Sequence, residues 1–406
     1  MTPRQSVFAA MCAGLGVALM AFALRHGQAA VSRTSLEHLG RRPAAPTAAT
    51  VAMTPAPAWP TPAPALRLAR HSSSAAPARP GPTRHPNPPP AAPDADLVPI
   101  RQVTFDGCCP GAWWAADSSA LHFIDRPNGR LGVYGVPLRP PGSLPRMVDT
   151  ALDLRDGGTR LVVHPAAEHS VVKDVESGLE WPLPTGGNPV RLAPDGTRAV
   201  WWEAPAGRAQ VELLGKVYAS GIDGAGAQAI GGLFDVDVVG FLADNVQVAV
   251  VGRPVRDDPA YILAALDTRT GALRELARGN WLSDVVLSRG RAWAAYVVSL
   301  DRRNPDANGV WVVPTDPSTG GPRKLDRFGG YRWRDDQRLV VVPMEPGSAS
   351  HSIWQFDAAA GSTTRLVDPA AVPIRVANND WSVSPDGHHL AFVAEDDRNI
   401  WVVELP

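Results

Sequence analysis

The chain ends in the stretch WSVSPDGHHLAFVAEDDRNIWVVELP, residues 381–406, which decides the fold. A short apolar segment runs into Pro385, Asp386 and Gly387, a second apolar segment follows, and a third, centred on Trp401, comes after a polar loop. Asp begins tight turns by bonding to nearby backbone, and Gly accepts the positive φ that such turns need. The stretch therefore predicts three consecutive antiparallel β-strands.

Degenerate copies of this pattern occur six times upstream. Each copy is anchored on the turn between its first and second strands, and successive anchors lie 39 to 50 residues apart. A self-similar unit of this length indicates a repeat architecture in which each repeat is one small sheet. The seven anchors are Asp117, Asp156, Asp195, Asp244, Arg289, Asp336 and Asp386.

The strands of the repeats have a consistent composition. The second strands are near-continuous apolar runs such as TRAVWWE and HHLAFVA, as expected for strands covered on both faces by neighbouring sheets. Large aromatic residues recur in the middle of the third strands, and we expect this column to pack between neighbouring units. The column consists of Tyr134, Tyr218, Trp311, Trp354 and Trp401.

A fourth strand is visible in several units, for example as ALRELA and TTRLVD, but the last unit has none. Before the first unit, IRQVTF, residues 100–105, reads as a fourth strand without a unit of its own. Pairing of this segment with the last unit would leave no free sheet edge. We therefore predict that residues 100–105 close a ring of repeats.

These patterns predict an all-β fold, a seven-bladed β-propeller of four-stranded blades over residues 97–406, closed by an N-terminal strand. The units resemble those of TolB-type and WD-repeat-like bacterial β-propellers, and SPDGHHLAFVAEDDRNIWVVEL and APDGTRAVWW carry the resemblance. Middle units depart from it, as in LSRGR, where Arg289 replaces the Asp, so counts of six to eight blades stay open. The resemblance implies an architecture and a binding role, and it carries over no catalytic residue.

Two further segments precede the repeats. Residues 1–30 contain an uncharged apolar run, 7–24, near the minimum length of a membrane-spanning helix. We predict an uncleaved anchor, with a cleaved signal and a secreted protein as the alternative. Residues 31–96 are rich in Pro and Ala and predict a disordered linker.

The location of the repeat domain is predicted from two opposing signals. Arginines after the apolar run favour a cytoplasmic repeat domain by the positive-inside rule. Short N-terminal anchors usually export the part of the chain on their C-terminal side, so we predict a membrane-anchored, extracytoplasmic domain, in the periplasm or at the cell surface.

The bulk composition excludes some function classes. A formal net charge of −1 and a pI of about 6.8 give no basic field, so no nucleic-acid partner is predicted. The cysteines, Cys12, Cys108 and Cys109, lack zinc-site spacing, and no cofactor is predicted. The adjacent Cys108 and Cys109 are either two thiols in a turn or, in an exported domain, a strained vicinal disulfide.

Catalytic motifs are missing from the sequence. It contains no G-x-S-x-G nucleophile elbow, no H-E-x-x-H zinc motif and no Gly-rich phosphate loop. His388 and His389 are adjacent at the start of a predicted strand, so their side chains point to opposite faces and cannot chelate one ion together.

The loops between second and third strands hold the remaining polar residues of interest. In a propeller these loops open on one face with the connections between units, and binding residues usually lie on such loops. Several are dense in charge, such as GRPVRDDPAY and SLDRRNPDANG, although solvated turns with local Arg–Asp pairs give the same pattern. The candidate binding residues are Arg126, Arg130, His164, Glu168, Arg253, Arg256, Asp257, Asp258, Asp301, Arg302, Arg303, His351, Glu395, Asp396, Asp397 and Arg398.

The sequence thus predicts a non-catalytic, membrane-tethered propeller whose loop-lined face binds a protein or a glycan. The alternative is a lyase or hydrolase with its active site in the central funnel. The candidates for that chemistry are Asp257, Asp258, Asp301, His164 and His351.

Overall fold

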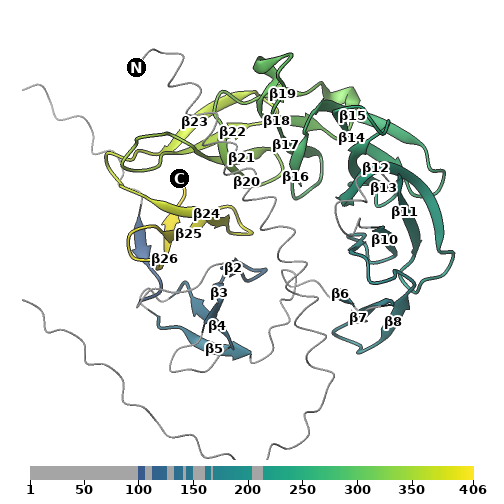
Figure 1. Cartoon of the computed structure of the whole chain (residues 1–406). Helices are drawn as coiled ribbons and strands as arrows, with labels where there is room; N and C mark the ends of the chain where they lie inside the picture. The colour runs from purple at the N-terminus through teal and green to yellow at the C-terminus, as the bar shows by residue number, and fades with distance from the viewer. Residues whose placement is uncertain are drawn as a thin grey trace, which may run out of the picture. The chain divides into compact units, whose positions relative to one another are not determined.

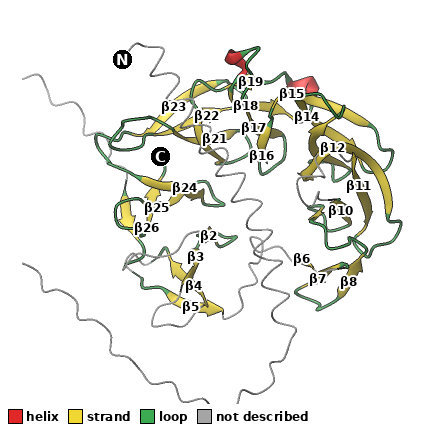
Figure 2. Ribbon diagram, in the orientation of Figure 1, coloured by secondary structure: helices red, strands yellow, loops and turns green. Residues whose placement is uncertain are grey.

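The computed structural model describes residues 99–105, 112–125, 132–139, 143–149, 161–165, 168–203 and 214–406. These residues form strands and loops with two short 3-10 helices, η3 (Pro305–Ala307) and η4 (Pro317–Thr319) (Figure 2). The strands are β1 (Ile100–Gln102), β2 (Trp113–Trp114), β3 (Ala120–Asp125), β4 (Gly132–Pro137), β5 (Arg146–Asp149), β6 (Leu161–Pro165), β7 (Ser170–Asp174), β8 (Glu180–Leu183), β9 (Val190–Leu192), β10 (Arg198–Trp202), β11 (Leu214–Gly221), β12 (Gln228–Phe241), β13 (Gln247–Arg253), β14 (Ala260–Asp267), β15 (Leu273–Asn280), β16 (Ser283–Leu287), β17 (Trp293–Val298), β18 (Gly309–Pro314), β19 (Arg323–Lys324), β20 (Gly329–Trp333), β21 (Arg338–Pro343), β22 (Ile353–Asp357), β23 (Ser362–Val367), β24 (Val376–Val383), β25 (His389–Ala394) and β26 (Ile400–Glu404).

The described strands form six sheets, and every pairing between neighbouring strands is antiparallel. Four sheets have four strands each: β2–β5, β16–β19, β20–β23, and β24–β26 with β1. Strands β9–β15 form one seven-stranded sheet, and β6–β8 form a sheet of three. Within the repeat domain the sheets follow one another around a ring (Figure 1). The all-β propeller predicted from the repeats is therefore confirmed.

The prediction of seven separate four-stranded blades is wrong for the described strands. Five of their sheets have four or more strands, and one has three. The main cause is β12, which has 14 residues and runs from one repeat into the next. Up to Phe234 it pairs with β11, and from Phe234 onward it pairs with β13. Two repeats thus share one strand and one sheet. The anchor Asp156 lies outside the described residues.

The closing strand forms as predicted, although it is shorter than residues 100–105. β1 pairs with β26, with Ile100 opposite Val403 and Gln102 opposite Trp401. Past the strand end, the backbone N–H of Val103 donates to the carbonyl of Ile400 at 2.8 Å. The N–H of Ile400 donates in turn to the hydroxyl of Thr104 at 2.8 Å, and Thr104 is only 2% exposed. The two ends of the repeat region are therefore joined by a buried hydrogen-bonded seam.

The turn chemistry follows the prediction at four anchors. The carboxylates of Asp117, Asp195, Asp244 and Asp386 each accept the backbone N–H two residues further on, at 2.9 to 3.0 Å. The residue after each of these carboxylates has positive φ, as expected for such turns. Each of these turns is held by hydrogen bonds between residues that are close in sequence. Their recurrence is therefore a sign of the repeat and not of an active site.

The two anchors that depart from the motif, Arg289 and Asp336, form hydrogen bonds to neighbouring repeats. In the sixth repeat Asp335, and not the expected Asp336, accepts the N–H groups that form the turn. Asp336 instead accepts the N–H of Gly290 in the fifth repeat, where the motif lacks its own Asp. Arg289 donates to the carbonyl of Ser384 in the seventh repeat at 2.5 Å. The departures from the motif therefore link three repeats to one another.

Four members of the aromatic column pack between neighbouring sheets, as expected, and Tyr134 does so in a cluster with residues of β24, β25 and β26. Trp311 packs against a cluster that contains residues of β14 and β17, and Trp354 packs against one that contains residues of β17 and β21. Trp401 packs with residues of β21 and β25. Tyr218 instead stacks on Trp201 of its own sheet, with ring centroids 5.6 Å apart.

The predicted anchor and linker, residues 1–30 and 31–96, lie outside the described residues. Among the residues that are described, no helix is long and apolar enough to cross a membrane.

Replacing Thr104 with Val tests the closing seam. The change keeps the shape of the side chain but leaves the buried N–H of Ile400 without its acceptor, which costs about 1–3 kcal/mol. Urea denaturation should show a loss of this size in the free energy of unfolding. The matched control is Thr364→Val on an exposed position of β23, which should stay within about 0.5 kcal/mol of wild type. Equal effects of the two variants would contradict the seam.

Candidate functional site

The ends of the sheets define two faces of the repeat domain. Because the strands of each repeat are antiparallel, the loops after the second strands and the connections to the next repeat lie at the same end. We call this end the loop face. The turns between first and second strands and between third and fourth strands lie at the opposite end, which we call the turn face.

Exposed apolar side chains concentrate on the loop face. Of the thirteen large apolar side chains that are exposed in the described residues, seven lie on it and four on the turn face. The loop-face set is Phe105, Leu214, Val255, Trp281, Leu300, Phe328 and Met344. Five of these occupy consecutive loop-face connections between residues 255 and 344.

A cleft of about 380 Å³ lies between β15 and the neighbouring sheet β16–β19. Its volume falls in the range of small-molecule sites. Gly279 allows the two sheets to come this close, since a Cβ there would lie 2.7 Å from the side chain of Val298. The polar and aromatic residues lining it are Arg278, Asn280, Tyr296, Asp301, Asn304 and Trp311.

Tyr296 is the most buried aromatic of this cleft. It is 2% exposed, and burial raises the pKa of its phenol. Trp311 lies opposite it on the neighbouring strand, and the indole N–H of Trp311 donates to the carbonyl of Ala307 at 2.8 Å. The Tyr296 hydroxyl has no hydrogen-bond partner within the described part of the chain, and it is reached by solvent from the cleft.

An exposed tryptophan comes directly after β15, the strand whose last residues line the cleft. Trp281 follows the lining residue Asn280, is 52% exposed, and has a φ of 43°, a left-handed conformation that is rare for a bulky residue. Its ring stacks on Tyr261, with centroids 6.1 Å apart. Arg253 lies over the Tyr261 ring at 5.7 Å, and the Tyr261 hydroxyl donates to Asp235. Burial and this hydrogen bond raise the pKa of Tyr261.

Two predicted carboxylates approach the cleft. Asp258 lies 3.8 Å from Arg278, a lining residue that also bonds Glu275 at 2.6 Å, and the bond to Glu275 raises the pKa of Arg278. Asp301 lines the cleft itself, and its carboxylate accepts the N–H groups of Arg303 and Asn304 at 3.0 and 2.8 Å. The role of Asp301 is thus largely to order its own loop.

A second group of predicted residues meets where the sixth and seventh repeats adjoin. Arg375 bonds the carboxylates of Glu395 and Asp396 at 3.0 and 2.8 Å. His351 accepts the N–H of Val376 through Nδ1 at 3.0 Å. Burial lowers the pKa of His351, so the imidazole is held neutral as a hydrogen-bond acceptor.

The other predicted residues do not assemble into one site. The carboxylate of Asp397 accepts the indole N–H of Trp401, and the Arg256 carbonyl accepts from Arg253 at 2.6 Å. The remaining described positions are separate: His164 is half-buried, whereas Glu168, Asp257, Arg302, Arg303 and Arg398 are exposed. The candidate positions outside the described residues are Arg126, Arg130, Cys108 and Cys109.

Sequence reasoning missed Arg278, Trp281, Tyr296 and Arg375. A signal existed for Trp281 alone, because a large aromatic stands in GNWLSD where a polar connection is expected. Tyr296 and Arg278 lie in strands, where they read as ordinary sheet residues.

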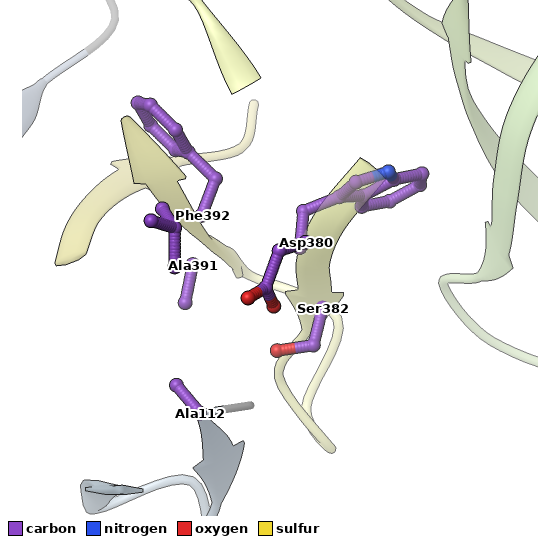
Figure 3. Close-up of a pocket in the computed structure, with 7 residues that line it drawn as sticks. Ala112, Asp380, Ser382, Ala391 and Phe392 are labelled. Carbon is purple, nitrogen blue, oxygen red and sulfur yellow. The ribbon is translucent and has the colours of Figure 1, made fainter. Parts of the chain in front are cut away.

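Neither a metal cluster nor the crevice beside β24 and β25 adds a second site among the described residues. No group of three His, Cys, Asp or Glu residues that could hold a metal ion occurs in the parts of the chain that are described. A crevice beside β24 and β25 has Asp380 and Ser382 on one side and Ala391 on the other, with Ala112 below (Figure 3). It is too narrow for a water molecule.

Comparisons with known proteins identify the fold. An oligogalacturonate lyase in complex with manganese has a TM-score of 0.50 and 13% identity, covering 77% of this chain and 95% of its own. The fold is a β-propeller. TolB from Acinetobacter baumannii has a TM-score of 0.37 and 12% identity, covering 75% of this chain and 78% of its own. The propeller domain of the trilobed protease from Pyrococcus furiosus has a TM-score of 0.41 and 10% identity, covering 70% and 78%.

These likenesses concern the fold alone, because the identities are low. TolB and another propeller are among these structural neighbours, and the sheets of this chain form the propeller that the expected resemblance implied. No protein-family model matches the chain, and no curated protein sequence matches it.

His351 gives a pH-dependent test of the contact between the sixth and seventh repeats. Because its folded pKa is lowered, its contribution to stability is complete above the unfolded pKa of about 6.5 and is lost as the pH falls below that value. We expect wild type to be more stable than His351→Asn at pH 7.5, and the difference to shrink by pH 5.5 in urea denaturation. A difference that is constant with pH would contradict the neutral acceptor role.

Proposed function

We propose that this chain is a non-catalytic binding protein that takes a protein or glycan partner on its loop face, between residues 253 and 344. The observation that carries the proposal is the coincidence of exposed apolar side chains with an open cleft on this part of the face. Exposed apolar groups rimmed by polar residues mark interaction sites in soluble proteins. The charged residues Arg256, Asp257 and Arg302 are exposed in the same loops and would form such a rim.

The geometry of the candidate catalytic residues favours binding over the lyase or hydrolase alternative. General acid–base chemistry needs groups within hydrogen-bond reach of each other or of a common substrate atom. The five candidates Asp257, Asp258, Asp301, His164 and His351, all described, share no hydrogen bond or ion pair with one another. Asp301 and His351 are instead engaged with backbone N–H groups.

The proposal includes a tether. The apolar run 7–24 would anchor the chain, the Pro-rich residues 31–96 would act as an extended spacer, and the loop face would be presented outside the cytoplasm. Fractionation of cells that express the full chain tests this. We expect the protein in the membrane fraction and its release by detergent but not by high salt. Recovery in the soluble fraction would contradict the anchor.

Paired substitutions on the two faces test the binding proposal. Crosslinking followed by capture with the full chain should recover a reproducible partner from a cell-envelope extract. Val255→Asp combined with Met344→Asp should reduce the recovery at least fivefold, because both side chains lie exposed on the loop face.

The matched control is Val175→Asp combined with Leu179→Asp, two exposed apolar residues of the turn face, which should leave recovery unchanged. No reproducible partner, or equal loss in both double variants, would overturn the proposal.

A further inference from the structure

The cleft beside β15 has nearly balanced charges. Its lining includes one cation, Arg278, and one carboxylate, Asp301. Arg278 bonds Glu275 through both Nε and Nη2, at 3.1 and 2.6 Å, and lies 3.8 Å from Asp258. An anionic ligand would have to displace these carboxylates, and a cationic ligand would meet the guanidinium. The electrostatics therefore favour a neutral ligand.

The uncharged polar groups of the cleft can form several hydrogen bonds to such a ligand. Asn280 and Asn304 each offer an amide with two donors and an acceptor, and the Tyr296 hydroxyl offers a donor and an acceptor. Tyr296 is 2% exposed and has no partner among the described residues, so a bound hydroxyl would satisfy it without displacing an existing bond. Because this hydroxyl is open to the cleft, a ligand hydroxyl can reach it.

Aromatic surface adjoins these groups. The ring of Trp311 lines the cleft, and Trp281 stands exposed next to the lining residue Asn280. The left-handed φ of Trp281 costs free energy, and such conformations cluster at ligand sites. Tyr261 supports one face of the Trp281 ring. A ligand whose ring has an apolar face and hydroxyls around its edge fits this arrangement of aromatic surface and polar groups.

We infer that the cleft between β15 and β16–β19 binds a neutral sugar, with Trp281 contacting the ring and the Tyr296 hydroxyl, Asn280 and Asn304 bonding its hydroxyls. The volume of about 380 Å³ is sufficient for a mono- or disaccharide. The inference rests on the proposed binding function of the loop face and names the ligand class of one part of it.

The test uses the full chain and three neutral disaccharides, cellobiose, lactose and N,N′-diacetylchitobiose, with glucuronic acid as the charged comparison. Isothermal titration and saturation-transfer NMR should show binding of at least one disaccharide and at least tenfold weaker binding of glucuronic acid. Tyr296→Phe should weaken the binding about threefold to tenfold, because one buried hydrogen bond is lost. Trp281→Ala should weaken it by at least tenfold.

The matched control is Tyr218→Phe, which removes an exposed hydroxyl bonded to Glu203, and it should bind as wild type. Absence of disaccharide binding overturns the inference, and so does binding that Tyr296→Phe and Trp281→Ala leave unchanged. Either result leaves the proposed function standing if the loop-face variants still lose the captured partner. If no disaccharide binds and the loop-face variants also keep the captured partner, both proposals are overturned.

Discussion

The repeat domain depends on the seam that joins β1 to β26. A ring of repeats has two free sheet edges until its ends pair, and free edges favour association with other chains. The pairing is short, but it continues into Val103 and Thr104, whose bonds to Ile400 are buried. Because Thr104 and Ile400 are almost 300 residues apart, the bond forms only when the intervening repeats are in place. The seam therefore couples the first and last repeats and fixes the loop face between them.

Contacts between sheets add to this constraint. Arg334 is 3% exposed and donates to the carbonyls of Gly387 and Pro406 and to the side chain of Gln355, so one guanidinium joins the sixth and seventh repeats. The hydroxyl of Tyr331 donates to the carbonyl of Asp284 at 2.6 Å, which joins the sixth repeat to the fifth. A scaffold held in this way can present strained or exposed residues, such as Trp281, at little risk to the fold.

Local turn chemistry and strand composition predicted most of the fold, whereas the contacts between repeats could not be predicted from the sequence. The Asp386 turn and the closing strand were predictable because their signals are local or depend on a missing strand. The merging of two repeats by β12 was not, since Gly231 and Gly232 would ordinarily indicate a break between strands, whereas β12 runs through them. The site was harder still. Asp258 and Asp301 were predicted from charge, but Tyr296 matters through its position in the cleft, which only the packing of the sheets reveals.

The central claim is that the loop face, and not the turn face, meets the partner. Val255 and Leu179 are exposed to nearly the same extent, 59% and 58%, on opposite faces, so a photo-activatable residue at either position samples solvent equally. Irradiation of full chains in a cell-envelope extract should give a discrete adduct from position 255 and none from position 179. Adducts from position 179 alone, or the same adducts from both, would contradict the account.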